Sequence, residues 1–486
     1  MGGRPRYPSA FPLRHTSSPR LQTFMPADSI RLMIYIICRA NHKTVVVHPR
    51  PLIVTRASAS GGGCPGLVGA ANVTVAGILP DLYASITLGA VALLSPTVSN
   101  AGIHIAVVGC GYWGSKHVRV LNTLDEVAEV ILVDSREDRL TSLARTYRTA
   151  PCFTSLTDAL HRADAVVVAT PPSTHVPIAL QVIGAGKHVL VEKPLAIATA
   201  DARRVIDAAS AASVVLMIGH TFEYNPAVRK LRELVRDKEL GELYYLDSAR
   251  LNLGLYQDDV NVILDLGPHD VSIVNYVLGR KPVAVQAWAA RHAHRRFEDV
   301  AYLRLFYDDF FDGRGLSANI HVSWLDPCKV RRVTAVGSEK MVVYDDLAQD
   351  ERIRVLDKGV CLSQAGGNLT QPPMSYRYGD ILVPFVAADE PLAVQDSHFA
   401  DCITSGLAPL TGGENGLAVV EVLEAAQLSR RLGRPVLLAE LGSHVQAIHE
   451  LVPARTHPNG YRFPEATEQN GRRRNTPLPA LRQEGG

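Results

Sequence analysis

The sequence predicts an α/β protein that begins with a doubly wound parallel sheet and continues into an α+β domain with a large, mostly antiparallel open sheet. Three observations carry this prediction. A glycine-rich turn, 109–114, follows an apolar strand and opens a helix. Continuous apolar runs and amphipathic stretches alternate regularly from 103 to 218. Beyond His220 the pattern changes to long strands in succession.

The first of these domains is expected to consist of alternating strands and helices. Strands that are apolar on both faces and separated by helices are typical of a parallel sheet covered on both sides. The expected strands are 103–108, 130–133, 165–170, 188–191 and 214–218. The expected helices run from the glycine turn to about Leu124, then over 137–147, 176–186 and 199–212.

The second domain is expected to be richer in strands. Long segments of alternating polarity that follow one another directly indicate an antiparallel sheet. The expected strands are 242–253, 283–290, 299–307, 315–324 and 330–344. The expected helices are 225–239, 262–278 and a closing segment from about 394 to 432.

The predicted domain boundaries follow from these changes of pattern. Residues 101–222 form the dinucleotide-binding domain, 223–450 the α+β domain, and 451–486 a polar, proline-rich tail. Residues 1–100 are basic and lack a sustained period, which leaves three interpretations open: a disordered extension, an organellar targeting segment, or sequence upstream of a misplaced start.

Composition restricts the possible partners. Residues 1–100 hold nine basic and two acidic residues and carry +7, whereas the remainder, with 41 basic and 46 acidic residues, carries −5. A mildly acidic body argues against nucleic acid as a partner. No apolar run reaches the length of about 18 residues that a membrane span needs, so no membrane association is expected.

The seven cysteines are scattered and include no CxxC pair. This usage favours reduced thiols in the cytoplasm over a disulfide framework, and no metal site is predicted.

The glycine turn indicates a bound dinucleotide. Gly109 permits a tight turn, Gly111 allows the backbone to approach a pyrophosphate, and Gly114 allows close packing of helix on strand. Asp134 ends the next strand, where a carboxylate accepts hydrogen bonds from ribose hydroxyls and repels a 2′-phosphate, which favours NAD over NADP. Arg136 beside it is compatible with NADP, so the preference is for NAD without excluding NADP.

Further cofactor contacts are expected where other strands end, because open α/β sheets bind ligands at their carboxyl edge. Tyr112 and Trp113 either line the cofactor or pack at the start of the helix. The remaining predicted cofactor-binding residues are Thr170, Pro171, His175, Glu192 and Lys193.

Three residues are candidates for the chemistry. Asp265 and His269 are four residues apart in a predicted helix, so the carboxylate is expected to orient the imidazole. Lys193 ends a strand at the mouth of the predicted crevice, where an ammonium can hold a substrate oxygen and stabilise a developing alkoxide. The less favoured alternatives are a surface lysine that caps a strand end and a histidine with a structural role.

The chain from about Ile103 to Leu438 resembles the Gfo/Idh/MocA oxidoreductases. The resemblance rests on the order of five features: the glycine turn, Thr170-Pro171-Pro172-Ser173-Thr174-His175, Glu192-Lys193-Pro194, Asp265-Leu266-Gly267-Pro268-His269, and a mainly β domain at the carboxyl end. Two further segments are similar to the nucleotide-sugar and amino-sugar 3-dehydrogenase branch. These are His220-Thr221-Phe222-Glu223-Tyr224-Asn225-Pro226 and Arg250-Leu251-Asn252.

The resemblance implies a Rossmann domain and a substrate-binding and oligomerisation domain. It implies that Lys193, Asp265 and His269 form the catalytic group, and that the chain forms a homodimer or homotetramer through the open face of its large sheet. Tyr224, Asn225 and Asn252 are expected to contact a sugar. The function expected is NAD-dependent oxidation of a secondary hydroxyl on a sugar or nucleotide sugar, with His269 as general base.

Three alternatives to this function stay open from the sequence. The first is a dehydrogenase of inositol or another polyol, and the second is an NAD-dependent glycosidase of the same fold. The third is a nucleotide-binding sensor without chemistry.

Overall fold

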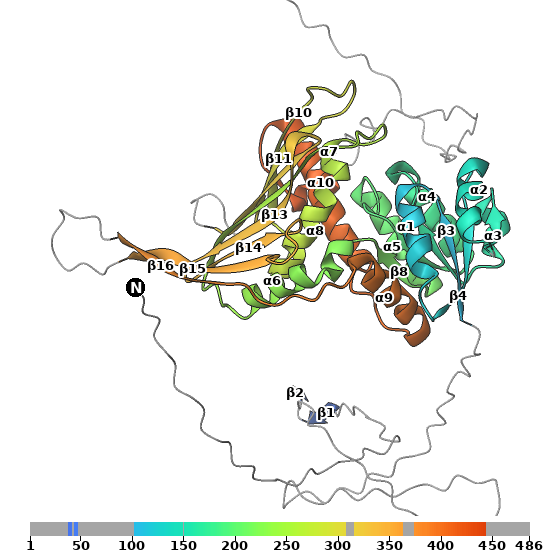
Figure 1. The fold of residues 1–486 in the computed structure, drawn as a ribbon, viewed down its shortest axis with the longest axis horizontal. Coiled ribbons are helices and arrows are strands. Elements are labelled where there is room, and N and C mark those ends of the chain that lie inside the picture. Colours follow the sequence, from blue (N-terminus) through green and yellow to red (C-terminus); the bar gives the residue numbers. More distant parts are fainter. Residues whose placement is uncertain are drawn as a thin grey trace, which may run out of the picture. The chain divides into compact units, whose positions relative to one another are not determined.

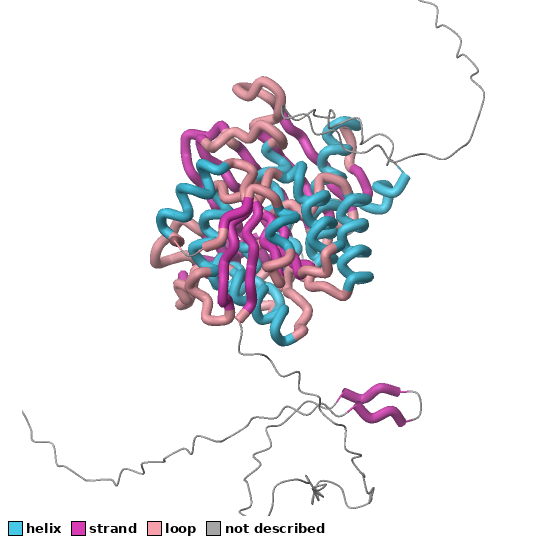
Figure 2. The backbone as a smooth tube through the Cα atoms, turned by 90° about the vertical axis from the view of Figure 1, so that its right-hand side faces the viewer, coloured by secondary structure: helices cyan, strands magenta, loops and turns pink. Residues whose placement is uncertain are grey.

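The computed structural model describes residues 37–40, 43–46, 102–148, 150–307, 315–362 and 374–443. Two compact units divide the chain at Ser95 and Pro96. In the first, β1 (Ile37–Ala40) and β2 (Lys43–Val46) pair in antiparallel register (Figure 2), a feature that the sequence did not predict. The rest of the predicted extension 1–100 and the predicted tail 451–486 lie outside the described residues.

The second unit begins with a six-stranded parallel sheet of order β5-β4-β3-β6-β7-β8 (Figure 1). Numbered within this sheet, the order is 3-2-1-4-5-6, the doubly wound arrangement of dinucleotide-binding domains. Its strands are β3 (Ile103–Val108), β4 (Val127–Val133), β5 (Cys152–Phe153), β6 (Ala165–Val168), β7 (His188–Val191) and β8 (Leu216–Ile218). Its helices are α1 (Tyr112–Leu121), α2 (Glu137–Thr146), α3 (Leu156–Leu160), η1 (Pro172–Thr174), α4 (His175–Gly184) and α5 (Thr199–Ala212).

A nine-stranded, mostly antiparallel sheet of order β16-β15-β14-β13-β9-β12-β11-β10-β17 forms the rest of this unit. Its only parallel pair is β9 with β12 among the described strands. The strands are β9 (Leu243–Leu253), β10 (Ala284–Ala290), β11 (Val300–Phe306), β12 (Ser317–Ser323), β13 (Leu325–Gly337), β14 (Met341–Asp345), β15 (Ile353–Leu362), β16 (Met374–Leu382) and β17 (Val436–Leu437).

Helices cover one face of this large sheet and reach the parallel sheet. They are η2 (Thr221–Tyr224), α6 (Pro226–Arg236), α7 (Val262–Asp265), α8 (Gly267–Leu278), α9 (Pro391–Ser405), α10 (Gly413–Leu432) and η3 (Leu438–Ser443). The long helix α10 packs against β10 and α8 on one side and against α5 on the other, and α9 packs against α1 (Figure 1). These contacts join the two sheets through helices at the carboxyl end of the chain.

The predicted fold class is confirmed, and most predicted elements are present with ends shifted by a few residues. Three predicted elements are in fact divided. The expected strand 330–344 is a hairpin of β13 and β14, and the expected helix 394–432 is α9 and α10, separated by a segment that contains Gly406 and Pro409. The expected helix 262–278 breaks at Leu266 into α7 and α8.

In the described residues, no helix is long and apolar enough to cross a membrane. The same residues contain no group of three or more His, Cys, Asp or Glu arranged to hold a metal ion.

The packing of the glycine turn yields a test of the fold. A Cβ at Gly114 would collide with the backbone carbonyl of Gly109, the residue that turns the chain with a φ of +90°. We expect Gly114→Ala to lower the free energy of unfolding by about 1–3 kcal/mol, because the helix must move away from the strand. Urea unfolding followed by circular dichroism measures this change.

Gly184→Ala is the matched control for this substitution. Gly184 lies at the end of α4, and apart from its chain neighbours and the backbone of its own helix no atom lies within 4 Å of the place that an added Cβ would occupy. We expect that variant to be as stable as the parent or up to about 1 kcal/mol more stable, since alanine favours a helix. Equal effects of the two substitutions would show that the close approach at Gly114 is unimportant.

Candidate active site

The glycine turn fits the pyrophosphate of a dinucleotide. Gly111 is the N-cap of α1 and no side chain caps this helix end, so the first amides of α1 stay available to an anion. Thr170 lies beside the turn, with its methyl group 2.9 Å from where a Cβ of Gly109 would be. Tyr112 is exposed and packs edge-on against Trp113 (ring centroids 5.7 Å apart), which leaves both at the rim of the turn.

Asp134 lies where the sequence predicts, after β4, but its carboxylate is largely engaged within the protein. It accepts hydrogen bonds from the amides of Cys110 (2.8 Å) and Arg136 (2.9 Å), and from the guanidinium of Arg139 (3.3 Å). The guanidinium of Arg136 turns away to Asp138. Asp134 thus fixes the glycine turn to the end of β4 while keeping acceptor capacity for ribose hydroxyls.

His175 is buried between two loops that follow neighbouring strands. Its Nδ1 lies 2.8 Å from the carbonyl of Pro194 and its Nε2 lies 2.8 Å from that of Thr170. Burial lowers the pKa of this imidazole below its usual value, and a neutral ring donates to only one of the two carbonyls. Its visible role is to tie the segment around Pro171 to the segment around Lys193.

Lys193 and Asp265 meet at the carboxyl end of β7. The ammonium of Lys193 donates to the backbone carbonyl of Asp265 at 2.8 Å and lies 3.3 Å from its carboxylate. Trp324 donates from Nε1 to the other carboxylate oxygen at 3.0 Å. Lys193 therefore connects the parallel sheet to α7, and one of its three donors remains for a substrate oxygen.

Asp265 does not contact His269 in the way that the sequence predicts. The two residues belong to different helices, because α7 ends at Asp265 and α8 begins at Gly267. The carboxylate instead holds Lys193 and Trp324. The hydrogen bonds of the Asp265 carboxylate thus go to these two partners, and none goes to the imidazole of His269.

His269 lies in the first turn of α8 with its ring edge-on to Phe222, at a centroid distance of 5.2 Å. Burial, followed by the positive charges of Lys193, Arg250 and Arg331, holds the pKa of His269 well below its usual value. The imidazole is therefore neutral near pH 7 and able to accept a proton.

The three predicted substrate residues occupy different places. Tyr224 is buried and its hydroxyl lies 3.1 Å from that of Thr411. Asn225 is also buried, and its side chain caps α6 by accepting from the amide of Ala227. Only Asn252, half-buried at the end of β9, stays accessible to a ligand among the three.

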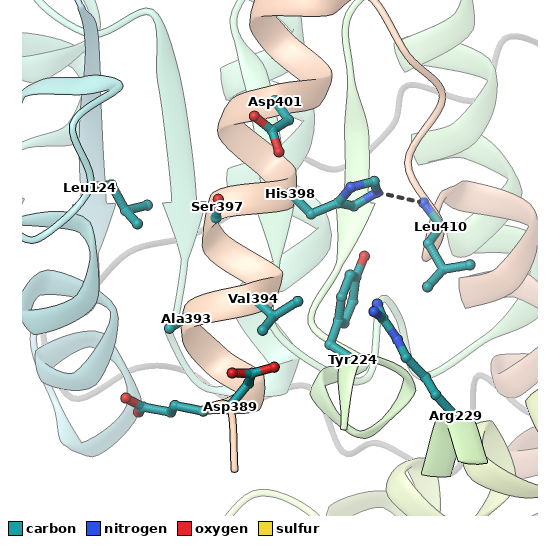
Figure 3. Close-up of a pocket in the computed structure, with 11 residues that line it drawn as sticks. Leu124, Tyr224, Arg229, Asp389, Ala393, Val394, Ser397, His398, Asp401 and Leu410 are labelled. Carbon is teal, nitrogen blue, oxygen red and sulfur yellow. Dashed lines mark hydrogen bonds between the residues drawn. The ribbon is translucent and has the colours of Figure 1, made fainter. Parts of the chain in front are cut away.

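Tyr224 lines a separate cavity of about 520 Å³ that contains none of the three predicted catalytic residues. Figure 3 shows its ring beside His398, with the guanidinium of Arg229 close to it; the rings of Tyr224 and His398 are 5.6 Å apart. The cavity lies against α9, so it is formed by packing between that helix and η2.

The sequence did not reveal a buried ionic triad behind Lys193. His117 of α1 is inaccessible to solvent; its Nε2 lies 3.0 Å from Glu192 and its Nδ1 2.9 Å from Asp396 of α9. Burial alone disfavours the imidazolium, but attraction to Asp396 and Glu192 outweighs it and raises the pKa of His117 to about 10. The partners are 75 and 279 residues distant in sequence, so no local motif indicates the triad.

The triad positions the end of β7, next to Lys193. Glu192 also accepts a hydrogen bond from the amide of Lys193 at 3.1 Å. A Cβ at Gly219 would lie 3.0 Å from the Glu192 carboxylate, so only glycine leaves this space open. Glu192, which the sequence predicts as a cofactor contact, therefore bonds to His117 and to the backbone amide of Lys193.

A second buried polar group, also missed from the sequence, follows β8. Asn415 of α10 donates to both carboxylate oxygens of Glu223, and its own oxygen lies 2.6 Å from Nδ1 of His220. Burial raises the pKa of Glu223 to about 8 and lowers that of His220 to about 4. This pair is therefore close to neutral at physiological pH and links η2 to α10.

The His117 triad predicts a pH-dependent stability. A histidine with a pKa near 6.5 when unfolded and about 10 when folded stabilises the fold fully below pH 6.5 and less as the pH rises toward 10. We expect His117→Gln to cost about 3–5 kcal/mol at pH 6.5, because two buried carboxylates lose their shared cation. The difference from the parent should shrink as the pH approaches 10.

Urea unfolding of both proteins between pH 6 and 10 measures this difference. His161→Gln, at an exposed histidine of the parallel-sheet domain, is the control and should show no such trend. A difference between parent and His117→Gln that is constant over this range would contradict an imidazolium in the triad.

Two consecutive segments of the described chain match a known family of enzymes. Residues 103–220 match the oxidoreductase family with an NAD-binding Rossmann fold, GFO_IDH_MocA, and residues 228–343 match the Gfo/Idh/MocA C-terminal domain. Among curated relatives, D-apiose dehydrogenase of Paraburkholderia graminis is 24% identical over 363 residues, which cover 71% of this chain and 92% of that protein.

A second curated relative is similar over a shorter segment. UDP-N-acetylglucosamine 3-dehydrogenase of Acidithiobacillus ferrooxidans is 33% identical over 182 residues, which cover 37% of this chain and 56% of that protein.

Solved structures agree with the sequence matches. GenD2 from gentamicin A biosynthesis, crystallised in complex with NAD, is 30% identical and has a TM-score of 0.57, covering 69% of this chain and 96% of its own. The match to GenD2 therefore combines 30% sequence identity with coverage of nearly the whole GenD2 chain. The chain belongs to the Gfo/Idh/MocA family of oxidoreductases, with an NAD-binding Rossmann domain.

Proposed function

We propose that this protein is an NAD-dependent dehydrogenase that oxidises a secondary hydroxyl of a sugar or nucleotide sugar. The observation that carries the proposal is the contact of Lys193 with Asp265, which brings the carboxyl edge of the parallel sheet to the helices that bear His269. Relatives named as D-apiose, UDP-N-acetylglucosamine and inositol dehydrogenases support a hydroxyl on a sugar or cyclic polyol.

The residues divide the work of alcohol oxidation among them. NAD, when bound, supplies the hydride acceptor. The free donor of Lys193 holds the substrate oxygen and stabilises negative charge on it, while neutral His269 accepts the hydroxyl proton. Asp265 keeps the ammonium in place and Trp324 keeps Asp265 in place, so the pair is held before substrate arrives.

A substrate panel tests the proposed activity. Free hexoses and pentoses, UDP-sugars and inositols are incubated with the full chain and either NAD or NADP, and NAD(P)H is followed by absorbance. We expect NADH to accumulate with at least one sugar or nucleotide sugar. Activity confined to inositols would favour the polyol alternative, and no activity on any compound would overturn the proposal.

Substitution of His269 tests its role as the base. We expect His269→Ala to lower kcat by about 10²–10⁴-fold, the usual contribution of a positioned base, while NAD binding measured by calorimetry is unchanged. His161→Ala, at an exposed histidine, is the control and should keep full activity. Retention of kcat by His269→Ala would contradict this assignment.

We further propose that the open face of the large sheet binds a second copy of the chain. Trp288, Tyr302 and His321 are cross-strand neighbours on β10, β11 and β12, and the ring of Tyr302 stacks on that of His321 at 4.0 Å. Trp288 is 55% exposed and Tyr302 is 50% exposed. A contiguous aromatic surface of this kind is typical of an interface.

Sedimentation equilibrium of a charged variant tests this surface. We expect the parent to be a dimer or tetramer and Tyr302→Glu to shift it toward the monomer, because a carboxylate would be buried without a partner. Leu407→Glu, at a residue 63% exposed in the segment between α9 and α10, adds the same charge elsewhere and should not change the assembly. A monomeric parent would refute the proposed interface.

We also propose that the enzyme is cytoplasmic. Cys110, Cys152, Cys328 and Cys402 are free thiols, which suits a reducing compartment.

A further inference from the structure

Two arginines lie side by side on the helix-covered face of the large sheet. Arg250 of β9 and Arg331 of β13 are direct partners in the antiparallel ladder. The next pairs on the same face, Ser248 with Val333 and Leu246 with Ala335, are buried. Like charges in directly opposite positions repel one another, so this pair needs compensation.

The two arginines are compensated unequally. Arg250 is buried: its Nε donates to Asp270 at 2.6 Å, and its guanidinium lies over the ring of Phe222 at 4.4 Å. The side chain of Arg331 is 38% exposed, and Nη1 donates to Asp346 at 3.2 Å. Among the described residues this is the one side-chain hydrogen bond of Arg331, so most of its five N–H donors have no protein partner there.

The Asp346 carboxylate has other hydrogen-bond partners besides Arg331. Its other carboxylate oxygen accepts from the hydroxyl of Tyr344 at 2.9 Å and lies 3.4 Å from the amide nitrogen of Asn225. The carboxylate thus anchors one edge of the Arg331 guanidinium to the sheet and to the start of α6. The opposite edge of the guanidinium has no hydrogen-bond partner among the described residues and is open in this sense.

This open edge lies near the proposed base. Asp270, the partner of Arg250, follows His269 directly in α8, and Phe222 contacts both Arg250 and His269. Burial and then the charges of Lys193, Arg250 and Arg331 depress the pKa of His269. Because Arg331 lies opposite Arg250, and Arg250 and His269 both contact Phe222, an anionic group bound at Arg331 would belong to the part of the substrate on the side of His269.

We infer that Arg331, backed by Arg250, binds an anionic group of the substrate, a carboxylate or a phosphate, close to the carbon that is oxidised. The inference rests on the proposed function. A planar guanidinium with two parallel donors matches a carboxylate or phosphate, and charge-assisted bonds of this kind are about twice as strong as neutral ones. Arg250 adds a second positive charge on the neighbouring strand, and the hydrogen bond to Asp346 orients the Arg331 guanidinium.

Kinetics on matched sugars test the inference. Glucose, glucuronate, glucose 6-phosphate, UDP-N-acetylglucosamine and its uronate are compared with NAD and the full chain. We expect an anionic sugar to exceed its neutral counterpart about tenfold or more in kcat/KM. Glucuronate and glucose 6-phosphate distinguish a carboxylate from a phosphate, and the two UDP-sugars test whether a distal diphosphate suffices.

Arg331→Gln should raise KM for the anionic substrate about 10–100-fold with little change in kcat or in activity on the neutral sugar. Arg331→Lys should restore part of this loss. Arg236→Gln is the matched control, since Arg236 lies at the end of α6 and its side chain is 65% exposed. An unchanged KM in Arg331→Gln would overturn the inference while leaving the proposed function intact.

A binding measurement keeps the inference testable if none of these sugars is oxidised. The NAD-loaded protein is titrated with glucuronate and with glucose 6-phosphate by calorimetry. Binding that Arg331→Gln weakens about tenfold or more and Arg236→Gln does not would support the inference even though the proposed function had failed. Equal binding of charged and neutral sugars by the parent, or equal binding by both variants, would overturn it.

Discussion

A buried imidazolium shared by two carboxylates is the interaction on which the candidate active site depends. His117 belongs to the helix that opens at the glycine turn, Glu192 to the strand end that carries Lys193, and Asp396 to α9 near the carboxyl end. Each group alone would be costly to bury, and the three are tolerable only together. Helix α1, the end of β7 that carries Lys193, and α9 are therefore positioned by a single set of charges.

Lys193 extends this order into the second domain. Its ammonium reaches the end of α7, where Asp265 is held in turn by Trp324, which lies between β12 and β13. Polar contacts thus run from α1 through the end of β7 to the large sheet. Because every member is fixed by at least one other part of the chain, the ammonium proposed to hold the substrate oxygen is organised before a ligand binds.

The sequence predicts the fold well because its signals are local. Apolar strands, the glycine turn and the end of β7 at Glu192-Lys193 depend on neighbouring residues alone. The partners of the polar side chains could not be predicted in the same way. An i,i+4 spacing suggested that Asp265 orients His269, but the Asp265 carboxylate bonds to Lys193 and Trp324. The partners of His117 are distant in sequence, and Arg250 and Arg331 become neighbours only through the register of β9 and β13.

Helix α10 has a mechanical consequence. It packs against α5 of the parallel sheet and against β10 and α8 of the large sheet, and Asn415 near its start bonds to Glu223. Helix α10 is therefore part of the packing of both domains. Any opening of the space between them must slide or tilt α10 over its neighbours, a shear motion of small amplitude, instead of a swing about a flexible connection.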